Sequence, residues 1–473
     1  MNEVLLSQLR AAVGAANVLT DGDLSAWEQD WRKRTRGKAL AVVRPASTEE
    51  VAAVVRACAA AGTPIVPQGG NTGLVVGGVP DASGREVVLS LTRMNKVRAI
   101  DPANLTMTVD AGCVLQNLQQ AAEDAGLLFP LSLAAEGSCT IGGNLATNAG
   151  GTQVVRYGNT RELCLGLEVV TAQGEVWSGL TGLRKDNTGY DLRDLFIGSE
   201  GTLGVITGAT MKLYPLPAAS LTAWAAVPSM AAAVTLLGLA HRHLGAGLTG
   251  FEVMGQFALS LVDKHYAQLR VPLFRDFPYC VLLENSDQES EEHARGAFER
   301  LLEAALQDGC VADAVVAENI AQARGLWHIR ESIPLAQAEE GLNIKHDISL
   351  PVSRIPDFCG ETDALLQQQI AGVRLVNFGH LGDGNLHYNV QAPEGGDMKA
   401  FLAAHEEQVN TLVYDQVKRF DGSISAEHGI GGLKVGKLPD YKSKVAIRMM
   451  QALKKALDPQ NLLNPGRVVP PAG

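Results

Sequence analysis

The chain has 473 residues, more than one hydrophobic core usually serves, so two or three domains are expected. Its net charge of -11 argues against a general nucleic-acid binder. The longest apolar runs, such as Ala231 to Ala240, are far shorter than the roughly 18 residues of a membrane-spanning helix. Seven scattered cysteines fit neither a disulfide framework nor an iron-sulfur spacing, so a reducing, cytoplasmic location is expected.

The first residues predict a helix and no targeting segment. An early Glu3 and the single Arg10 are unlike both a signal peptide and an arginine-rich transit peptide. The basic run from Arg32 to Lys38 is most often a solvated loop and less often part of a partner surface. Residues 1–37 are therefore expected to form an N-terminal helical segment.

Strands and helices alternate over residues 38–217, which we expect to form one domain. Short β-branched runs predict strands, and amphipathic patterns between them predict helices. The predicted strands are 39–43, 87–91, 106–109 and 167–170, and the predicted helices are 49–61 and 116–125. Tyr214-Pro215-Leu216-Pro217 marks the end of this part.

The second half predicts another α+β domain over residues 218–420 and a C-terminal segment over residues 421–473. The predicted helices are 230–244, 290–308, 398–420 and 444–457, with strands around 248–253 and 279–284. Gly245 to Gly250 matches the dinucleotide fingerprint G-x-G-x-x-G. It follows a helix and precedes a strand, which is the reverse of the required order, so NAD binding is not expected there.

Three glycine-rich loops in the first half offer exposed backbone amides: Pro67–Leu74, Gly137–Gly151 and Gly198–Gly204. Backbone N–H groups unobstructed by a Cβ can hold an anion, and Asn71 and Thr72 add uncharged donors. A pyrophosphate group is the expected ligand of such loops. Any single loop could be an ordinary turn, but three of them suggest one long cofactor.

Two later segments carry a candidate metal site. His380 and His387 lie in N-F-G-H-L-G-D-G-N-L-H-Y-N, and Glu427 with His428 lies in S-A-E-H-G. Two imidazoles and one carboxylate suit zinc, manganese or iron and leave coordination positions open. One alternative is glycine turns that carry unrelated histidines, since the spacing is not the helical i, i+4 spacing. Another is a metal-dependent hydrolase that activates a water.

These segments carry a resemblance to a known family. The glycine loops resemble the FAD-binding domain of the vanillyl-alcohol oxidase and p-cresol methylhydroxylase superfamily. The segments G-H-L-G-D-G-N-L-H, S-A-E-H-G and L-L-N-P-G-R resemble the C-terminal domain of FAD-linked D-2-hydroxyacid dehydrogenases, and Arg330-Glu331 with Ile344–Pro351 looks most like the hydroxyglutarate branch. The resemblance covers nearly the whole chain.

The resemblance implies an α+β fold. It consists of a two-part FAD-binding domain of the p-cresol methylhydroxylase type, an α+β, ferredoxin-like substrate or cap domain with the metal site, and a C-terminal segment that returns to the FAD domain. It also implies a bound divalent metal, with Zn²⁺ expected first and Mn²⁺ or Fe²⁺ as alternatives. The implied metal ligands are His380, His387 and Glu427.

The resemblance further implies the residues that contact substrate and cofactor. Arg330, Lys345 and Asn389 would contact the substrate, although the two cations could instead form ordinary ion pairs. The implied FAD contacts are Pro67, Gln68, Gly69, Gly70, Asn71, Thr72, Gly73, Leu74, Ser138, Thr140, Gly142, Gly143, Asn144, Thr147, Asn148, Gly150, Gly151, Glu200, Gly201, Gly204, Val205, Ile206 and Asn464.

The implied reaction moves a hydroxyl proton to a base and a hydride from C2 to flavin N5. A metal bound to the hydroxyl would lower its pKa, and His428 is the candidate base or, alternatively, a histidine that orients its neighbours. Pro334 stands where the hydroxyglutarate branch has a threonine, so a hydroxyl donor is missing. D-2-hydroxyglutarate is the expected substrate, with D-lactate, D-malate or glycolate as alternatives.

The expected cofactor is non-covalent FAD, because residues 1–240 contain no histidine that could tether it. Cys113, Cys139 and Cys164 leave a cysteinyl link formally open, although small buried residues are the favoured interpretation. No haem or iron-sulfur motif provides an onward electron path, so an external acceptor such as electron-transfer flavoprotein or a quinone is implied. A flavoprotein subunit that only scaffolds a partner is another alternative. The oligomeric state stays open, with a homodimer among the alternatives.

Overall fold

The computed structural model describes residues 2–471, which form two compact units. Unit 1 contains the chain up to Gly150, Gly158–Leu216 and the chain from Glu427 onward, and unit 2 contains Gly151–Tyr157 and Pro217–Ala426. From the sequence, the chain was expected to leave the second domain and enter the C-terminal segment at residue 421. Residues 421–426 stay with unit 2 because Ser423 bridges to Ser349 and the Ala426 N–H donates to Asp347 O.

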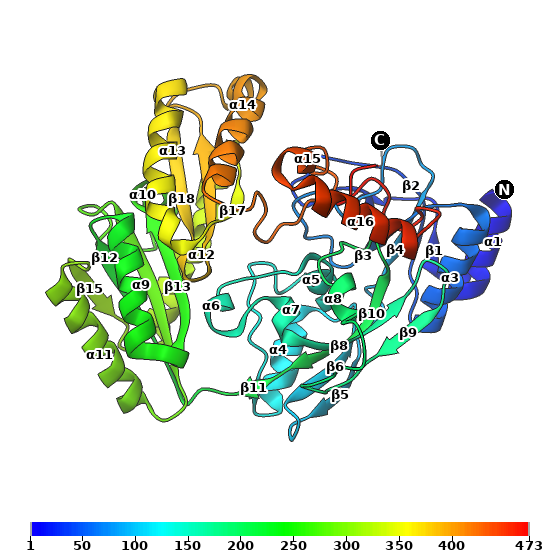
Figure 1. Ribbon diagram of the computed structural model, residues 1–473, viewed down its shortest axis with the longest axis horizontal. Helices are drawn as coiled ribbons and strands as arrows, with labels where there is room; N and C mark the ends of the chain where they lie inside the picture. Colours follow the sequence, from blue (N-terminus) through cyan, green and yellow to red (C-terminus); the bar gives the residue numbers. More distant parts are fainter. Residues whose placement is uncertain (1, 472–473) are drawn as a thin grey trace. The chain divides into compact units, whose positions relative to one another are not determined.

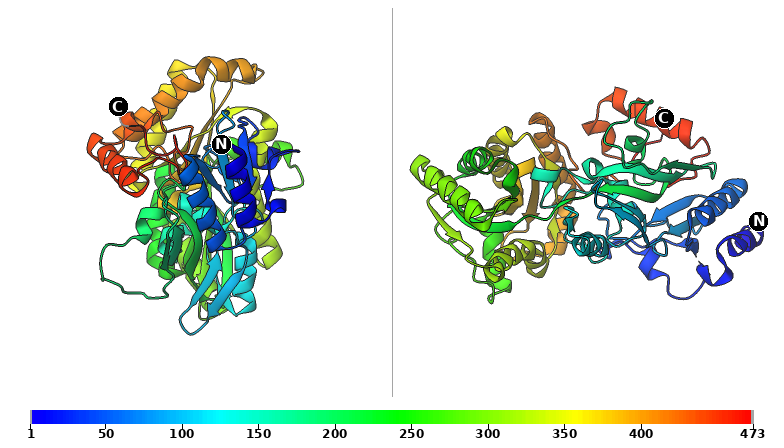
Figure 2. Two further views of the ribbon diagram at one scale, coloured as in Figure 1. Left: turned by 90° about the vertical axis from the view of Figure 1, so that its right-hand side faces the viewer. Right: turned by 90° about the horizontal axis from the view of Figure 1, so that it is seen from below.

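A four-stranded sheet opens unit 1, with the order β1-β2-β4-β3. Its strands are β1 (Val18–Leu19), β2 (Ala39–Val43), β3 (Ile65–Gln68) and β4 (Glu86–Ser90), of which β2, β4 and β3 run parallel. Helix α3 (Thr48–Ala61) begins where the Ser47 hydroxyl accepts the Glu50 N–H. Helix α1 (Asn2–Val13) packs beside α3 (Figure 2), so residues 1–37 join unit 1 and form no separate segment.

A five-stranded antiparallel sheet follows in unit 1, with the order β5-β6-β10-β8-β9. Its strands are β5 (Val97–Asp101), β6 (Thr106–Asp110), β8 (Cys164–Val170), β9 (Val176–Gly179) and β10 (Val205–Lys212). The other elements of unit 1 are α2 (Ser25–Glu28), α4 (Leu115–Asp124), β7 (Leu127–Leu128), α5 (Ile141–Thr147), α7 (Thr160–Leu163), α8 (Arg193–Phe196), β11 (Tyr214–Pro215), α15 (Leu438–Tyr441) and α16 (Lys444–Leu457).

Unit 2 is built on an eight-stranded antiparallel sheet, with the order β15-β12-β14-β13-β18-β19-β16 and with β17 also paired to β19. Its strands are β12 (Ala219–Val227), β13 (Leu248–Gly255), β14 (Tyr279–Asp287), β15 (Asp313–Val316), β16 (Asn343–Ile344), β17 (Asp347–Ser349), β18 (Arg374–His380) and β19 (Asn385–Gln391). Its helices are α6 (Val154–Tyr157), α9 (Met230–Leu244), α10 (Gln256–His265), α11 (Glu291–Asp308), α12 (Ile320–Glu340), α13 (Ile355–Gln369) and α14 (Met398–Arg419).

The first half of unit 2 has the ferredoxin-like arrangement. The strand order β15-β12-β14-β13 is that of a split βαβ motif, and the elements follow the order βαββαβ except that α10 is inserted between β13 and β14. Helices α9 and α11 pack together (Figure 1). Helices α10 and α12 pack over the face of the sheet that carries Trp224, Met254 and Leu282. Among residues 2–471, no helix combines the length and apolar character needed to cross a bilayer.

The secondary structure follows the sequence patterns closely. The predicted helices 230–244 and 444–457 are confirmed to the residue, and the other predicted helices agree within one residue. The predicted strands are confirmed as well, although β8 begins three residues earlier and β14 ends three residues later than expected. Gly245–Gly247 forms a single turn that leads from α9 into β13, which confirms that this glycine motif is not a dinucleotide fingerprint.

Candidate functional site: a flavin pocket and a histidine pair

The three predicted glycine loops line one pocket in unit 1. The lining residues from the predicted set are Pro67, Gln68, Gly69, Gly70, Asn71, Thr72, Gly73, Thr140, Gly142, Gly143, Asn144, Thr147, Glu200, Gly201, Gly204, Val205 and Ile206. Such a run of backbone amides is suited to an anionic group that needs many N–H donors. The pocket therefore fits the pyrophosphate of a dinucleotide cofactor, as the sequence predicted.

The first and second loops approach each other too closely for side chains. A Cβ on Gly69 would lie 2.2 Å from Thr140 Oγ1, and a Cβ on Gly70 would lie 2.0 Å from Ser138 O. Packing between the loops therefore disfavours a side chain at both positions, most strongly at Gly70, where the contact is with backbone. The Asn71 side-chain amide donates to Ala26 O at 3.0 Å and to Gln29 O at 2.9 Å, so its N–H groups are used within the protein.

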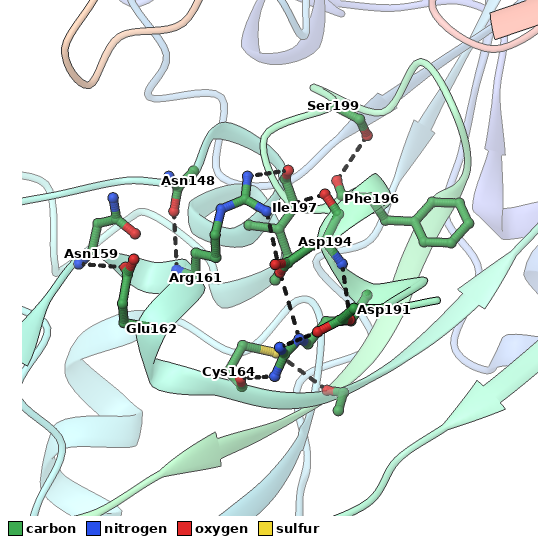
Figure 3. A network of polar contacts seen from close by, with 12 residues as sticks. Asn148, Asn159, Arg161, Glu162, Cys164, Asp191, Asp194, Phe196, Ile197 and Ser199 are labelled. Carbon is green, nitrogen blue, oxygen red and sulfur yellow. Dashed lines mark hydrogen bonds and ion pairs between the residues drawn. The ribbon is translucent and has the colours of Figure 1, made fainter. Parts of the chain in front are cut away.

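Polar contacts hold the third loop against the second (Figure 3). The Arg161 guanidinium donates to Asp194 O at 3.1 Å and to Ile197 O at 2.8 Å, and its backbone N–H donates to Asn148 Oδ1 at 3.0 Å. The Glu200 N–H donates to Ala146 O at 2.8 Å. One arginine thus ties the end of α5 to the chain that leads into Glu200.

Six predicted cofactor residues do not line the pocket, and several apolar residues that do were missed. The six are Leu74, Ser138, Asn148, Gly150, Gly151 and Asn464. Gly151 belongs to unit 2, whereas Ser138 and Asn148 support neighbouring loops through backbone and side-chain contacts. The missed lining residues are Val75, Val76, Gly77, Gly78, Val79, Leu91, Ala111, Cys139 and Ala146, and only Gly77 and Gly78 carry a local signal.

The cysteines of unit 1 are poorly suited to a covalent link. Cys113, Cys139 and Cys164 are all buried, and of these only Cys139 lines the pocket. Burial raises the pKa of the Cys113 and Cys164 thiols to about 12 and also raises the pKa of Cys139. The nucleophilic thiolate is therefore disfavoured at each position.

Unit 2 brings the two predicted histidines together. His380 ends β18, and His387 lies on the paired strand β19, where it stands opposite Phe378. The ring centroids of the two histidines are 5.7 Å apart, and a ring nitrogen of each lies within 4.8 Å of one of the other. A Cβ on Gly379 would lie 2.4 Å from Asn385 O, so the glycine beside His380 lets the two strands meet at this point.

A buried carboxylate that the sequence did not reveal orients His380. Glu252 on β13 accepts a hydrogen bond from His380 Nδ1 at 2.6 Å, and Arg330 Nε donates to the same carboxylate at 2.8 Å. Burial alone would raise the pKa of Glu252, but the charges of His380 and Arg330 lower it to about 2. A metal-binding histidine commonly donates its other ring nitrogen to a carboxylate in this way.

A second carboxylate lies beside His387. Asp347 Oδ1 is 4.0 Å from His387 Nδ1 and accepts a hydrogen bond from Asn385 Nδ2 at 2.9 Å. The chain leaves unit 2 at Ala426, whose N–H donates to Asp347 O at 3.3 Å. The next residue is Glu427, the third predicted ligand. Imidazole and carboxylate donors are those that zinc, manganese and iron accept, so the donor types of these predicted ligands suit the predicted metal.

Glu427 and His428 belong to unit 1. A Cβ on Gly150 would lie 2.3 Å from Glu427 Oε1, so the carboxylate rests against a glycine backbone. His428 lines the same pocket as the glycine loops. The candidate base therefore lies at the pocket predicted for the flavin.

Two of the predicted substrate residues, Arg330 and Asn389, form hydrogen bonds with other side chains of unit 2. Arg330 is buried against Glu252, and Asn389 Nδ2 donates to Gln337 Oε1 at 2.9 Å while Asn389 Oδ1 accepts the His346 N–H. These contacts were not expected for side chains that bind a ligand directly. Lys345 is half-buried and precedes His346, whose ring nitrogens contact Tyr388 O and Asn410 Oδ1.

Two family models match the chain. A model described as FAD binding domain matches residues 39–179, and one described as FAD linked oxidases, C-terminal domain, matches residues 216–468.

Individual relatives extend over the whole chain. A D-2-hydroxyglutarate dehydrogenase from Xanthomonas citri pv. viticola is 42% identical over 99% of this chain and 97% of its own length. A putative mitochondrial D-lactate dehydrogenase from Schizosaccharomyces pombe is 36% identical over 99% of this chain and 90% of its own length. The solved structure of p-cresol methylhydroxylase with substrate bound has a TM-score of 0.77 at 16% identity and covers 98% of this chain and 96% of that one, which shows the fold.

The predicted fold and the predicted family are thereby confirmed, and the protein is an FAD-dependent oxidoreductase that acts on CH–OH donors. The chain belongs to the FAD-linked oxidase family, within the group that contains the D-2-hydroxyglutarate dehydrogenases.

Proposed function

We propose that this protein oxidises D-2-hydroxyglutarate to 2-oxoglutarate with non-covalent FAD and a divalent metal, Zn²⁺ in the first instance. The observation that carries the substrate assignment is the 42% identity to a D-2-hydroxyglutarate dehydrogenase along both chains. The metal assignment rests on the histidine pair of unit 2 and on the carboxylate that holds His380.

The residues of the site have distinct roles in the proposed reaction. When bound, FAD would supply the hydride acceptor for the oxidation at C2, and the metal ion would supply a Lewis acid for the 2-hydroxyl. His380, His387 and Glu427 would hold the metal. His428 receives the hydroxyl proton, because it adjoins a metal ligand and lines the flavin pocket. The glycine loops hold the pyrophosphate through backbone N–H groups.

The substrate carboxylates would be held by the cations of unit 2. Lys345 offers an ammonium, and Arg330 offers the guanidinium nitrogen that does not face Glu252. Asn389 can offer the second N–H of its amide, since one already donates to Gln337. Glu252 fixes the orientation of Arg330, so any guanidinium contact with the substrate would be made from a rigid position.

D-lactate is the second candidate substrate. Pro334 lies inside α12 where the hydroxyglutarate branch has a threonine, and the fission yeast relative is described as a putative D-lactate dehydrogenase. Loss of a hydroxyl donor would weaken recognition of a second carboxylate more than of a methyl group. The electron acceptor is external, and electron-transfer flavoprotein or a quinone is the expected type. The cytoplasmic location and the homodimer stay predictions.

An anaerobic reduction experiment tests the proposal. Purified protein is mixed separately with D-2-hydroxyglutarate, D-lactate and their L-enantiomers, and bleaching of the flavin absorption band is followed before and after treatment with a chelator. Chelator-sensitive bleaching by D-2-hydroxyglutarate is expected. Bleaching by D-lactate alone would transfer the assignment to the second candidate, and the absence of bleaching by all four compounds would refute the dehydrogenase assignment. Insensitivity to the chelator would refute the role of the metal.

A further inference from the structure

Glu200 connects the flavin pocket to the segment that carries Glu427 and His428. Its carboxylate is only 9% exposed and lines the pocket. One oxygen accepts the Ile430 N–H at 2.7 Å, and the other accepts the Gly431 N–H at 2.9 Å. A buried carboxylate that accepts two backbone N–H groups fixes the path of that backbone.

The approach is so close that only glycine fits around it. A Cβ on Gly429 would lie 2.5 Å from Glu200 Oε1, and a Cβ on Gly431 would lie 2.2 Å from Val75 O. Both glycines also have positive φ angles, +81° and +50°, which glycine adopts without strain. The G-I-G run after His428 is therefore shaped to bring its amides onto Glu200.

Further contacts hold the same segment and Glu200 in place. The N–H groups of Gly432 and Leu433 donate to Val75 O at 3.0 and 3.3 Å. Asn464 Nδ2 donates to Glu200 O and to Gly77 O, both at 2.8 Å. Glu200 is thus held by its own backbone, and its side chain is directed at the segment that follows His428.

We propose that Glu200 is a positioning residue whose carboxylate sets the places of Glu427 and His428 through the N–H groups of Ile430 and Gly431. The inference rests on the proposed function, because it assumes that Glu427 binds a metal. It goes beyond that function because it assigns a role to a side chain that is not a proposed metal ligand. Glu200 would fix the backbone that follows Glu427 and His428. Partners that orient a ligand typically change metal affinity about 10- to 100-fold when they are removed.

Two variants separate this role from general stability. Glu200→Gln keeps the size of the side chain but turns one acceptor into an NH₂ donor, so one buried N–H loses its partner. Glu28→Gln is the matched control, because Glu28 is also buried in unit 1 and its Oε1 accepts a backbone N–H, that of Ala39, at 3.0 Å. Glu28 does not line the pocket.

The test uses full-length protein loaded with FAD. Zn²⁺ affinity is measured by competition with a chelator, FAD content by absorbance, and the exchange of backbone amides in residues 427–433 by mass spectrometry. We expect Glu200→Gln to bind Zn²⁺ at least about 10-fold more weakly than the wild type and to exchange the Ile430 and Gly431 amides faster, and the FAD content shows how far the pocket itself has changed. Glu28→Gln should match the wild type in all three.

Two results would overturn the proposal. One is wild-type Zn²⁺ affinity or wild-type amide exchange in Glu200→Gln. The other is a parallel loss of FAD and Zn²⁺ in both variants, which would indicate a general loss of folding. A wild-type protein that binds FAD but no Zn²⁺ would refute the metal part of the proposed function. Amide exchange alone would then decide the role of Glu200, with faster exchange supporting it and unchanged exchange refuting it.

Discussion

Glu252 and His380 are joined by a 2.6 Å hydrogen bond between strands that lie 128 residues apart in the chain. Arg330 Nη2 lies 2.7 Å from the second oxygen of the same carboxylate. Because the pKa of Glu252 is lowered to about 2, the carboxylate is an anion throughout the neutral range. It therefore holds the His380 ring in one orientation and neutralises a buried guanidinium.

Glu252→Gln is expected to weaken metal binding about 10- to 100-fold. It should also lower the free energy of unfolding by about 3–5 kcal/mol, because Arg330 keeps its charge in a buried site without a partner. Metal titration and denaturant unfolding measure the two effects. Glu284→Gln is the control, since that carboxylate contacts Thr249 Oγ1 and Trp327 Nε1 and no histidine. Equal metal affinity in wild type and Glu252→Gln would show that Glu252 does not orient a ligand.

The sequence predicted His380 and His387 but not Glu252, and the reason is physical. The histidines lie in a glycine-rich motif, whereas Glu252 lies in F-E-V-M, which looks like any strand with one charged residue. Only the pairing of β13 with β18 brings Glu252 to His380. Long-range strand pairing leaves no local pattern, so a partner of this kind is not visible in a single sequence.

The residues that line the pocket were also only partly predictable from the sequence. Glycine spacing was sufficient to find the three loops, because backbone amides that are left exposed to a ligand without an obstructing Cβ are often those of glycine. It could not show that Asn71 faces Ala26 and Gln29, since that contact depends on a segment 42 to 45 residues earlier in the chain. Apolar lining residues such as Val79 and Leu91 have no signal beyond hydrophobicity.

Gly70→Ala is expected to weaken FAD binding, and Gly73→Ala is its control in the same loop. A Cβ on Gly70 would lie 2.0 Å from Ser138 O, whereas nothing lies within 4 Å of a Cβ on Gly73. Backbone atoms must shift to relieve the first contact, at a cost of about 1–3 kcal/mol. This corresponds to about a 10- to 100-fold increase in Kd, which flavin fluorescence can measure. A similar increase in Gly73→Ala would indicate that the whole loop is intolerant of side chains.

The stability of unit 2 should depend on pH through Glu340. Its carboxylate contacts Lys264 Nζ and Arg374 Nη1 at 2.7 Å and His265 Nε2 at 2.8 Å. Burial raises the pKa of Glu340, but these hydrogen bonds and charges lower it by more than burial raises it. The resulting pKa is about 2, below the ordinary value of 4.5. A lowered pKa stabilises the fold above the ordinary value, and this stabilisation is lost as the pH falls from 4.5 to about 2.

At pH 6, Glu340→Gln should therefore melt at a lower temperature than the wild type. The loss in the free energy of unfolding should be on the order of 1 kcal/mol, because solvent screens these charges. The difference between the two proteins should shrink as the pH falls below 4.5 and should also shrink at high salt. Thermal melting followed by circular dichroism measures it. A difference that stays constant from pH 6 to pH 2 would mean that lost packing, and not lost charge, destabilises the variant.

Gly150→Ala is expected to displace Glu427 while leaving the fold intact. The new Cβ would lie 2.3 Å from Glu427 Oε1, at the end of a flexible side chain that can move away more easily than a backbone can. The carboxylate would then leave its place, and metal affinity should fall by roughly 10-fold or more. Gly238→Ala in α9 is the control, because nothing lies within 4 Å of its Cβ and alanine favours a helix by about 0.5–1 kcal/mol. Metal content measured on both variants after dialysis against the same buffered Zn²⁺ decides the matter. If Gly150→Ala retains full metal and melts like Gly238→Ala, then the position of Glu427 against Gly150 has no part in holding the metal.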